Sequence, residues 1–131
     1  TAQWIKGMPK NFHIAYPDTL ANYRRWSAAF SKEYIGSLLH EGLTDVETSF
    51  FEANFAAAIS AAEKYDVPLY CSEYGVIHQA DLESTLHWYQ TISAVFEKHH
   101  IGRAAWTYKE MDFGLTDAEA FPVMQKVLPL L

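Results

Sequence analysis

The sequence predicts an α/β fold in which parallel strands alternate with helices. Short apolar runs that end in glycine or polar residues alternate with longer segments whose apolar residues recur at helical spacing. This alternation is typical of parallel βαβ units with right-handed crossovers. The last predicted strand ends near Trp106, 33 residues after the previous one ends near Glu73, and about 31 residues make one unit of a (β/α)8 TIM barrel. About three units fit the chain, too few to close roughly eight strands, so we expect a partial barrel.

The composition is that of one folded domain with a modest core. The 131 residues are 50% apolar and 20% charged, a balance that excludes intrinsic disorder. The net charge of −6 argues against nucleic acid or an anionic membrane as a partner.

No apolar run approaches the ~20 residues of a membrane-spanning helix. Cys71 is the only cysteine, so no internal disulfide is possible. Because the chain begins at Thr1 with neither Met nor a signal peptide, we expect a mature product or a piece of a longer protein.

The first predicted unit is a weak strand followed by a helix. Residues 11–15 form a short apolar run that Tyr16-Pro17-Asp18 ends, and Asp18 is a plausible N-cap for the helix behind it. Its apolar positions are Leu20, Tyr23, Phe30, Tyr34 and Leu38. Gly42 ends this helix.

The second unit carries a stronger helix signal. Thr44 and Glu47 have the spacing of a capping box, and an apolar stripe runs from Phe50 to about Tyr65. A turn at 66–68 leads to the strand at residues 69–74.

The last unit begins at Asp81, which can cap the next helix. Its apolar stripe is Leu82, Leu86, Tyr89, Ile92 and Phe96. Gly102 is expected to end this helix, residues 103–107 to form a strand, and Pro122 to open a short final helix.

Glu73 is the first candidate for chemistry. A carboxylate at the C-terminal end of an apolar strand lies where (β/α) enzymes place catalytic groups. A charge beside buried residues costs free energy unless a partner or a reaction uses it. The alternative is an ordinary surface ion pair. The two-residue period of a strand predicts that Leu69, Cys71 and Glu73 share one face, with Cys71 as a small buried hydrophobe.

Three segments carry a resemblance to a known family. They are Glu73-Tyr74-Gly75, the run Ala-Trp-Thr-Tyr-Lys-x-Met-Asp-Phe-Gly-Leu at 105–115, and His13 with Tyr16. In these segments the chain resembles glycoside hydrolase family 5, the retaining cellulases with a (β/α)8 barrel. The match covers essentially the whole chain, as the last three of eight units. Residues 1–131 are therefore expected to be a single C-terminal fragment of the catalytic domain.

The resemblance implies a role for each matched residue. Glu73 becomes the nucleophile and Trp106 a floor on which a sugar ring packs, although a core Trp is the alternative for the latter. His13 would bind a sugar hydroxyl or donate to Glu73, unless it is only structural. Tyr16 would also donate to Glu73, although the spacing here is His-x-x-Tyr and the family has His-x-Tyr. Lys109 would meet outer sugar hydroxyls, or pair with Asp112 or solvent.

One departure concerns the second carboxyl group. The family's acid/base Glu follows an Asn on the fourth strand, and this chain contains no Asn-Glu pair. We therefore expect part of a retaining glycosidase for β-1,4-linked glucan that is inactive alone. Its partners would be a polysaccharide or oligosaccharide and either the missing N-terminal half of the barrel or another copy of itself. A secreted or periplasmic location follows only from the family's usual polymeric substrates.

No cofactor or metal is expected, because the histidines have no ligand spacing and no phosphate-binding glycine loop occurs. Two alternatives stay open. The first is a carbohydrate-binding remnant without catalysis, and the second is a (β/α) enzyme that uses Lys109 as a Schiff-base amine.

Overall fold

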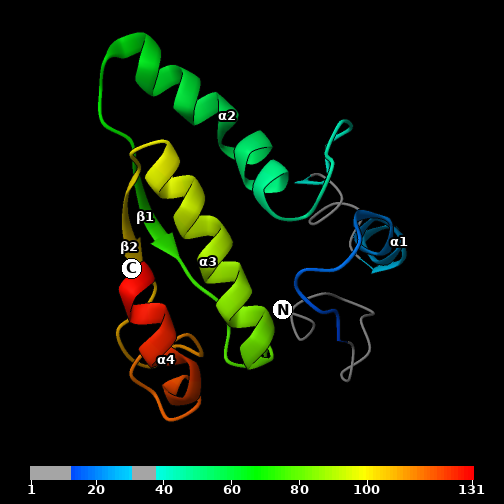
Figure 1. Cartoon of the computed structure of the whole chain (residues 1–131), viewed down its shortest axis with the longest axis vertical. Coiled ribbons are helices and arrows are strands. Elements are labelled where there is room, and N and C mark those ends of the chain that lie inside the picture. Colours follow the sequence, from blue (N-terminus) through cyan, green and yellow to red (C-terminus); the bar gives the residue numbers. More distant parts are fainter. Residues whose placement is uncertain (1–12, 31–37) are drawn as a thin grey trace.

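The computed structural model describes residues 13–30 and 38–131. Two parallel strands and the helices beside them form the ordered frame (Figure 1). The elements in chain order are α1 (Leu20–Phe30), α2 (Thr48–Tyr65), β1 (Tyr70–Tyr74), α3 (Leu82–Lys98), β2 (Gly102–Ala105), α4 (Phe121–Val127) and the 3-10 helix η3 (Leu128–Leu130).

The two strands confirm the predicted α/β fold with a parallel sheet. Tyr70 pairs with Gly102, Cys71 with Arg103 and Tyr74 with Ala105, and α3 is the crossover between the strands. β2 ends at Ala105, slightly before the predicted end of that strand. The helix that Pro122 was expected to open is present as α4, with the proline in its first turn.

The first predicted strand, at residues 11–15, is not formed in the described residues, so a partial barrel of three units is not confirmed. Residues 13–15 have no regular structure, and Asn11 and Phe12 lie outside the described residues. His13 and Ala15 are exposed. A short strand needs further strands or a helix to pack against before it is stable.

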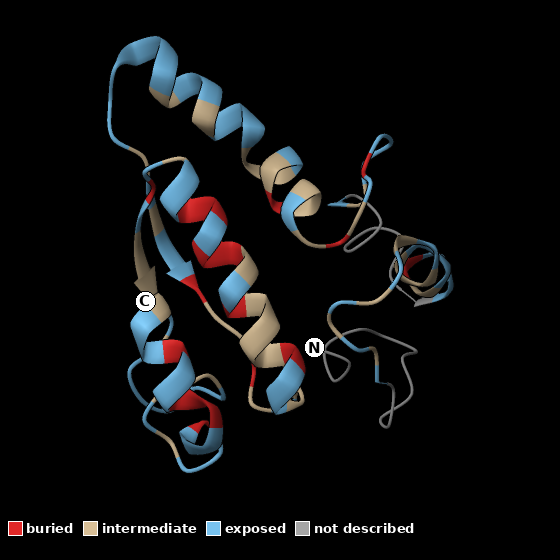
Figure 2. Ribbon diagram, in the orientation of Figure 1, coloured by how far each residue is buried: buried red, intermediate tan, exposed pale blue. Residues whose placement is uncertain are grey.

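α3 lies at the centre of the core. Tyr89, Ile92, Val95 and Phe96 are buried along it, and Figure 2 shows these buried positions as bands on the helix. The Phe96 ring, 0% exposed, lies 5.0 Å from the ring of Tyr74 on β1. This packing joins the sheet to the helices, so the position of β1 depends on α3.

Arg103 on β2 holds the last residues of the chain against this core. Its guanidinium donates to the backbone oxygens of Leu130 at 3.1 Å and Leu131 at 3.0 Å. It also pairs with Glu97 at 2.7 Å and lies over the Phe96 ring. One side chain thereby joins α3, β2 and η3.

The N-terminus of α3 is capped as predicted. The Asp81 carboxylate accepts from the Ser84 amide at 2.8 Å. At α1 the prediction was one residue off. The Thr19 hydroxyl accepts from the Asn22 amide at 3.2 Å, whereas Asp18 binds the Asn22 side chain.

The capping box predicted at Thr44 and Glu47 is not formed. α2 begins at Thr48, and Glu47 makes no side-chain cap bond. Asp45 and Ser49 make the reciprocal pair instead: Asp45 Oδ1 accepts from the Ser49 amide at 2.9 Å, and Ser49 Oγ accepts from the Asp45 amide at 3.1 Å. A better-placed carboxylate therefore took the role that the spacing of Thr44 and Glu47 suggested.

Gly102 does not end α3, contrary to the prediction. His100 takes the left-handed conformation, with φ of 52°, and the Ile101 amide bonds the Phe96 oxygen at 2.9 Å. Gly102 instead lets β2 pack closely against Tyr70 of β1, because a Cβ at this position would lie 2.8 Å from the Tyr70 ring.

The charge of Asp81 should make the stability of the chain sensitive to acid. Burial is the largest single influence and opposes ionisation, but the hydrogen bonds from Ser84 and the nearby His13 together lower the pKa of Asp81. The unfolded chain, with an Asp pKa of about 3.9, then takes up its proton first. The contribution of the Asp81 charge to the free energy of unfolding is therefore present above about pH 4. It is lost as the pH falls through the lower pKa of Asp81 in the folded state.

Asp81→Asn keeps a capping side chain without the charge. In urea unfolding between pH 7 and pH 3, we expect its stability to fall less steeply below pH 4 than that of the wild type. Asp81→Ala should lose about 1 kcal/mol at pH 7, the usual value of a cap. Equal slopes for the wild type and the Asn variant below pH 4 would contradict the prediction.

Candidate functional site

The C-terminal ends of β1 and β2 meet at one edge of the sheet. The Trp106 amide donates to the Tyr74 oxygen at 2.8 Å, directly beyond the paired residues Tyr74 and Ala105. Gly75 makes this approach possible, because a Cβ there would overlap the carbonyl oxygen of Trp106. Glu73 and Trp106 are therefore both at the edge where (β/α) enzymes carry catalytic groups.

Glu73 is exposed on β1. Among residues 13–30 and 38–131, no ion pair or side-chain hydrogen bond involves its carboxylate. The ordinary surface ion pair considered above is thus not formed. Its backbone oxygen accepts from the Cys71 thiol at 3.4 Å.

The predicted shared face of Leu69, Cys71 and Glu73 is wrong. The pairing of β1 with β2 is irregular between Cys71 and Tyr74, which interrupts the two-residue period of the strand. Leu69 and Cys71 pack against the core together with Tyr74, whereas Glu73 is exposed. Cys71 is therefore partly buried, as expected of a small hydrophobe, but on the helix side of the sheet.

Trp106 is 37% exposed, more than a core tryptophan would be. The peptide bond that follows it is cis. Its partly open position leaves aromatic surface available at the same end of the sheet as the exposed Glu73.

Residues 107–116 form a loop that folds back on itself. The Leu115 amide donates to the Thr107 oxygen at 2.8 Å, and the Thr116 amide donates to the Tyr108 oxygen at 3.1 Å. Lys109 is exposed in this loop, and within the described chain it forms no ion pair with Asp112. An exposed loop position lacks the burial that a Schiff-base lysine needs.

His13 and Tyr16 lie against the first turns of α3. His13 Nε2 is 3.5 Å from the Asp81 carboxylate, and the Tyr16 amide donates to Ser84 Oγ at 2.8 Å. Burial raises the pKa of Tyr16 to about 12, although the neighbouring Thr91 hydroxyl lowers it in part. Within the described residues no hydrogen bond or ion pair joins either side chain to Glu73. The structure thus groups Glu73 and Trp106 and leaves His13 and Tyr16 apart.

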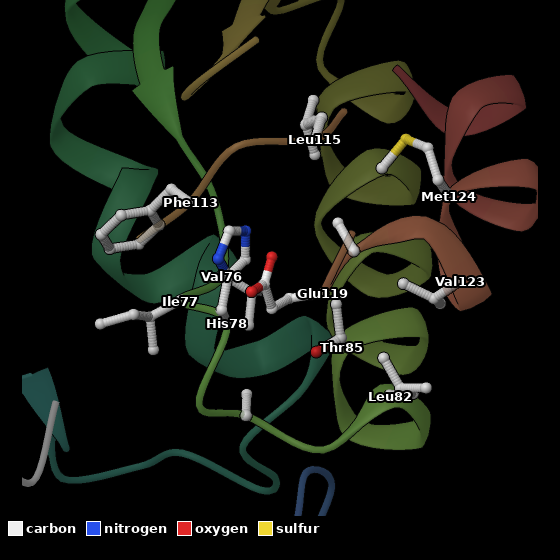
Figure 3. A pocket seen from close by; sticks show the side chains of 12 residues that line it. Val76, Ile77, His78, Leu82, Thr85, Phe113, Leu115, Glu119, Val123 and Met124 are labelled. Carbon is white, nitrogen blue, oxygen red and sulfur yellow. The ribbon is translucent and has the colours of Figure 1, made fainter. Parts of the chain in front are cut away.

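The sequence reasoning missed His78. Its amide donates to the Asp112 oxygen at 2.8 Å, and its ring Nε2 bonds the Gly114 oxygen at 3.0 Å. Figure 3 shows its ring and the Glu119 carboxylate at a small pocket of about 20 Å³, with Phe113 close by. The only sequence signal was the position of His78, five residues after Glu73 in the same βα connection.

A larger groove of about 340 Å³ lies between the N-terminal segment, α2 and α3. Most of its lining is apolar or aromatic and includes Tyr16, Phe51 and Trp88. Neither Glu73 nor Trp106 lines it, so the candidate site is an open edge and not this groove.

No metal site or membrane span is found in the part of the chain that the structure describes. There, no three His, Cys, Asp or Glu residues are grouped to hold a metal ion. None of the described helices combines the length and apolarity needed to cross a bilayer.

Comparison with known proteins finds cellulases. No family model matches the chain. Endoglucanase C of Acetivibrio thermocellus is 42% identical over 74 residues, which are 56% of this chain and 22% of that protein. Cellodextrinase A of Ruminococcus flavefaciens is 52% identical over 61 residues, 45% of this chain and 18% of that protein. The chain thus spans about a fifth of the length of these curated relatives.

Solved structures give the same result. A hyperthermophilic endo-beta-1,4-glucanase in complex with substrate matches with a TM-score of 0.51 and 27% identity, over 60% of this chain and 26% of that one. Thermotoga maritima Cel5A in complex with mannotriose matches with a TM-score of 0.53 over 92% of this chain and 42% of that one. At 19% identity the second match shows the fold alone. Together the relatives confirm the resemblance predicted from the sequence.

Proposed function

Because the chain resembles cellulases of glycoside hydrolase family 5 over part of its length, we propose that it is part of a retaining glycoside hydrolase. Its substrate would be a β-1,4-linked glucan, and its nucleophile Glu73. The observation that carries the proposal is the pairing of β1 with β2, which puts Glu73 and Trp106 at the same C-terminal edge of the sheet.

The proposed reaction needs two carboxyl groups about 5–5.5 Å apart. Glu73 attacks the anomeric carbon and forms a glycosyl ester as the leaving oxygen departs with a proton from the second carboxyl group. That group then takes a proton from the water that cleaves the ester. The Glu73 carboxylate is exposed and pairs with none of the described side chains, which suits the attacking role. The second carboxyl group is proposed to come from another part of the barrel.

Trp106 and the loop at 107–116 would form the sugar-binding side of the site. The partly exposed indole offers a flat surface for the C–H face of a sugar ring, and Lys109 can reach outer hydroxyls. His13 and Tyr16 are proposed to approach Glu73 only when the segment that carries them pairs beside β1 in a completed barrel.

We expect the isolated chain to be inactive and to associate. Without an acid/base carboxyl group it would lose the roughly 10²–10⁴-fold that general acid–base catalysis contributes. Among the described residues each strand of the two-stranded sheet also has one unpaired edge, and exposed strand edges promote pairing with other chains. The partner would be the remainder of the barrel or a second copy, in the secreted or periplasmic location usual for enzymes of polymeric glucans.

A completed barrel tests this function. In a chimera, this chain replaces the segment of Endoglucanase C that corresponds to it, and the rest of Endoglucanase C is kept. Turnover of a fluorogenic cellotetraoside by the chimera, and none by the isolated chain, is the expected result. Turnover by the isolated chain would mean that a second carboxyl group comes from within it or from a sister copy. No turnover by a folded chimera would contradict the proposal.

A carbohydrate-binding remnant is the second candidate, and one observation favours it. Tyr108, two residues after Trp106, is 75% exposed, and exposed aromatic rings could bind sugar without chemistry. Calorimetry of the isolated chain with cellotetraose distinguishes the two functions when it is combined with the turnover test. Binding that Trp106→Ala abolishes and Glu73→Gln preserves, together with an inactive chimera, would identify the remnant.

A further inference from the structure

The loop at 107–116 has a tip with an unfavourable backbone. Three successive residues with side chains have positive φ: 66° at Glu110, 61° at Met111 and 60° at Asp112. L-residues other than glycine rarely adopt this conformation, because the Cβ approaches the carbonyl oxygen. Contacts from outside the tip must therefore hold it.

Two anchors hold the tip, one on each side. On one side the Glu110 amide donates to the Asp117 carboxylate at 2.9 Å, a contact made within the same segment. On the other side His78 donates its amide to the Asp112 oxygen at 2.8 Å and bonds the Gly114 oxygen through ring Nε2 at 3.0 Å. Of these two anchors, only His78 ties the loop to the connection that follows Glu73.

The ring of His78 is held in a defined orientation. It lies partly buried at the small pocket shared with Phe113, Leu115 and Glu119 (Figure 3). A carbonyl oxygen only accepts, so Nε2 must carry the proton in this bond. The donor at the Nε2 position is thus the feature of the side chain that matters.

We propose that His78 is a positioning residue for sugar binding. Its backbone amide and its ring each hold the loop at 107–116 to the connection that follows β1, and so influence where Tyr108 and Lys109 lie relative to Trp106 and Glu73. The role in sugar binding rests on the proposed glycosidase function, whereas the anchoring of the loop does not.

Hydrogen exchange of the isolated chain tests the anchoring without any sugar. His78→Asn has a donor too short to reach Gly114, whereas His78→Gln puts an amide N–H near the Nε2 position. We expect the Leu115 and Thr116 amides to exchange roughly two- to tenfold faster in the Asn variant, the range that one hydrogen bond gives. Exchange in α3 should be unchanged, and the Gln variant should restore protection of the loop.

The outcomes separate cleanly. Unchanged loop exchange in a folded Asn variant overturns the proposal, and so does a folded Gln variant that fails to restore protection. If the Asn variant does not fold, the Gln variant decides: native protection of the loop supports the anchoring and lost protection refutes it.

The completed barrel tests the role in sugar binding. For the cellotetraoside we expect His78→Asn to raise KM about three- to tenfold with kcat within about twofold, because the loop contacts sugar away from the reacting bond. His78→Gln should restore KM. A lower kcat with unchanged KM would overturn the binding role. An inactive wild-type barrel would refute the glycosidase function and leave the exchange result on His78 standing.

Discussion

Glu73→Gln is expected to lower kcat of the completed barrel by roughly 10⁴- to 10⁶-fold, the scale seen when an essential catalytic group is removed. Glutamine has nearly the same size as glutamate, but its neutral amide cannot form the glycosyl ester. Glu73 is exposed and makes no side-chain bond among the described residues, so the substitution should leave stability within about 0.5 kcal/mol. Initial rates with the fluorogenic cellotetraoside and urea unfolding measure the two quantities.

Glu83→Gln is the matched control for this substitution. Glu83 is also exposed and lies in the first turn of α3, not on either strand. Its rate should stay within about twofold of the wild type. A Glu73→Gln barrel that keeps a tenth or more of its activity would remove Glu73 from the role of nucleophile.

Gly75→Ala is expected to destabilise the chain by at least about 1–3 kcal/mol, the usual cost of overpacking. The new Cβ would overlap the Trp106 carbonyl oxygen and lie 3.3 Å from its carbonyl carbon. These are backbone atoms, which cannot turn away as a flexible side chain can. The ends of β1 and β2 must separate, which also moves Trp106 away from Glu73. Urea unfolding measures the loss of stability. The KM of the completed barrel measures the displacement of Trp106.

Ser72→Ala provides the comparison on the same strand. Ser72 is exposed, so this change should alter stability by no more than about 0.5 kcal/mol. If Gly75→Ala is as stable as Ser72→Ala, the close approach of the two strand ends does not matter for the fold.

Local signals in the sequence predicted most of the elements. The apolar stripe and the cap at Asp81 identified α3, because a helix is recognised by contacts between residues three or four apart. The strands around Cys71 and Ala104 followed from short apolar runs between turns. Glu73 and Trp106 could be grouped in advance because parallel strands in successive units bring their C-terminal ends to one edge.

What the sequence could not show depends on contacts between distant residues. The hydrogen bond from His78 to Gly114 joins residues 36 positions apart in the sequence, and neither residue type predicts it. The pairing of β1 with β2 is irregular after Cys71, so buried and exposed residues stop alternating there and Ser72 and Glu73 are both exposed. His13 and Tyr16 were assigned beside Glu73 on the assumption that residues 11–15 form a strand, and residues 13–15 do not.

The exposed turn at 66–68 separates α2 from the strands and helices that carry the candidate site. Asp66 ends α2 in a left-handed conformation, and Asp66, Val67 and Pro68 are all exposed. The elements after this turn are joined by the Phe96 core and by Arg103, which binds both α3 and the last residues, although Phe55 of α2 also stacks on Phe96. An exchange of DNA at this turn would transfer Glu73, Gly75, His78 and Trp106 together, whereas the contacts of Phe55 with Phe96 and of Glu52 with Lys98 would have to be formed anew with the incoming helix.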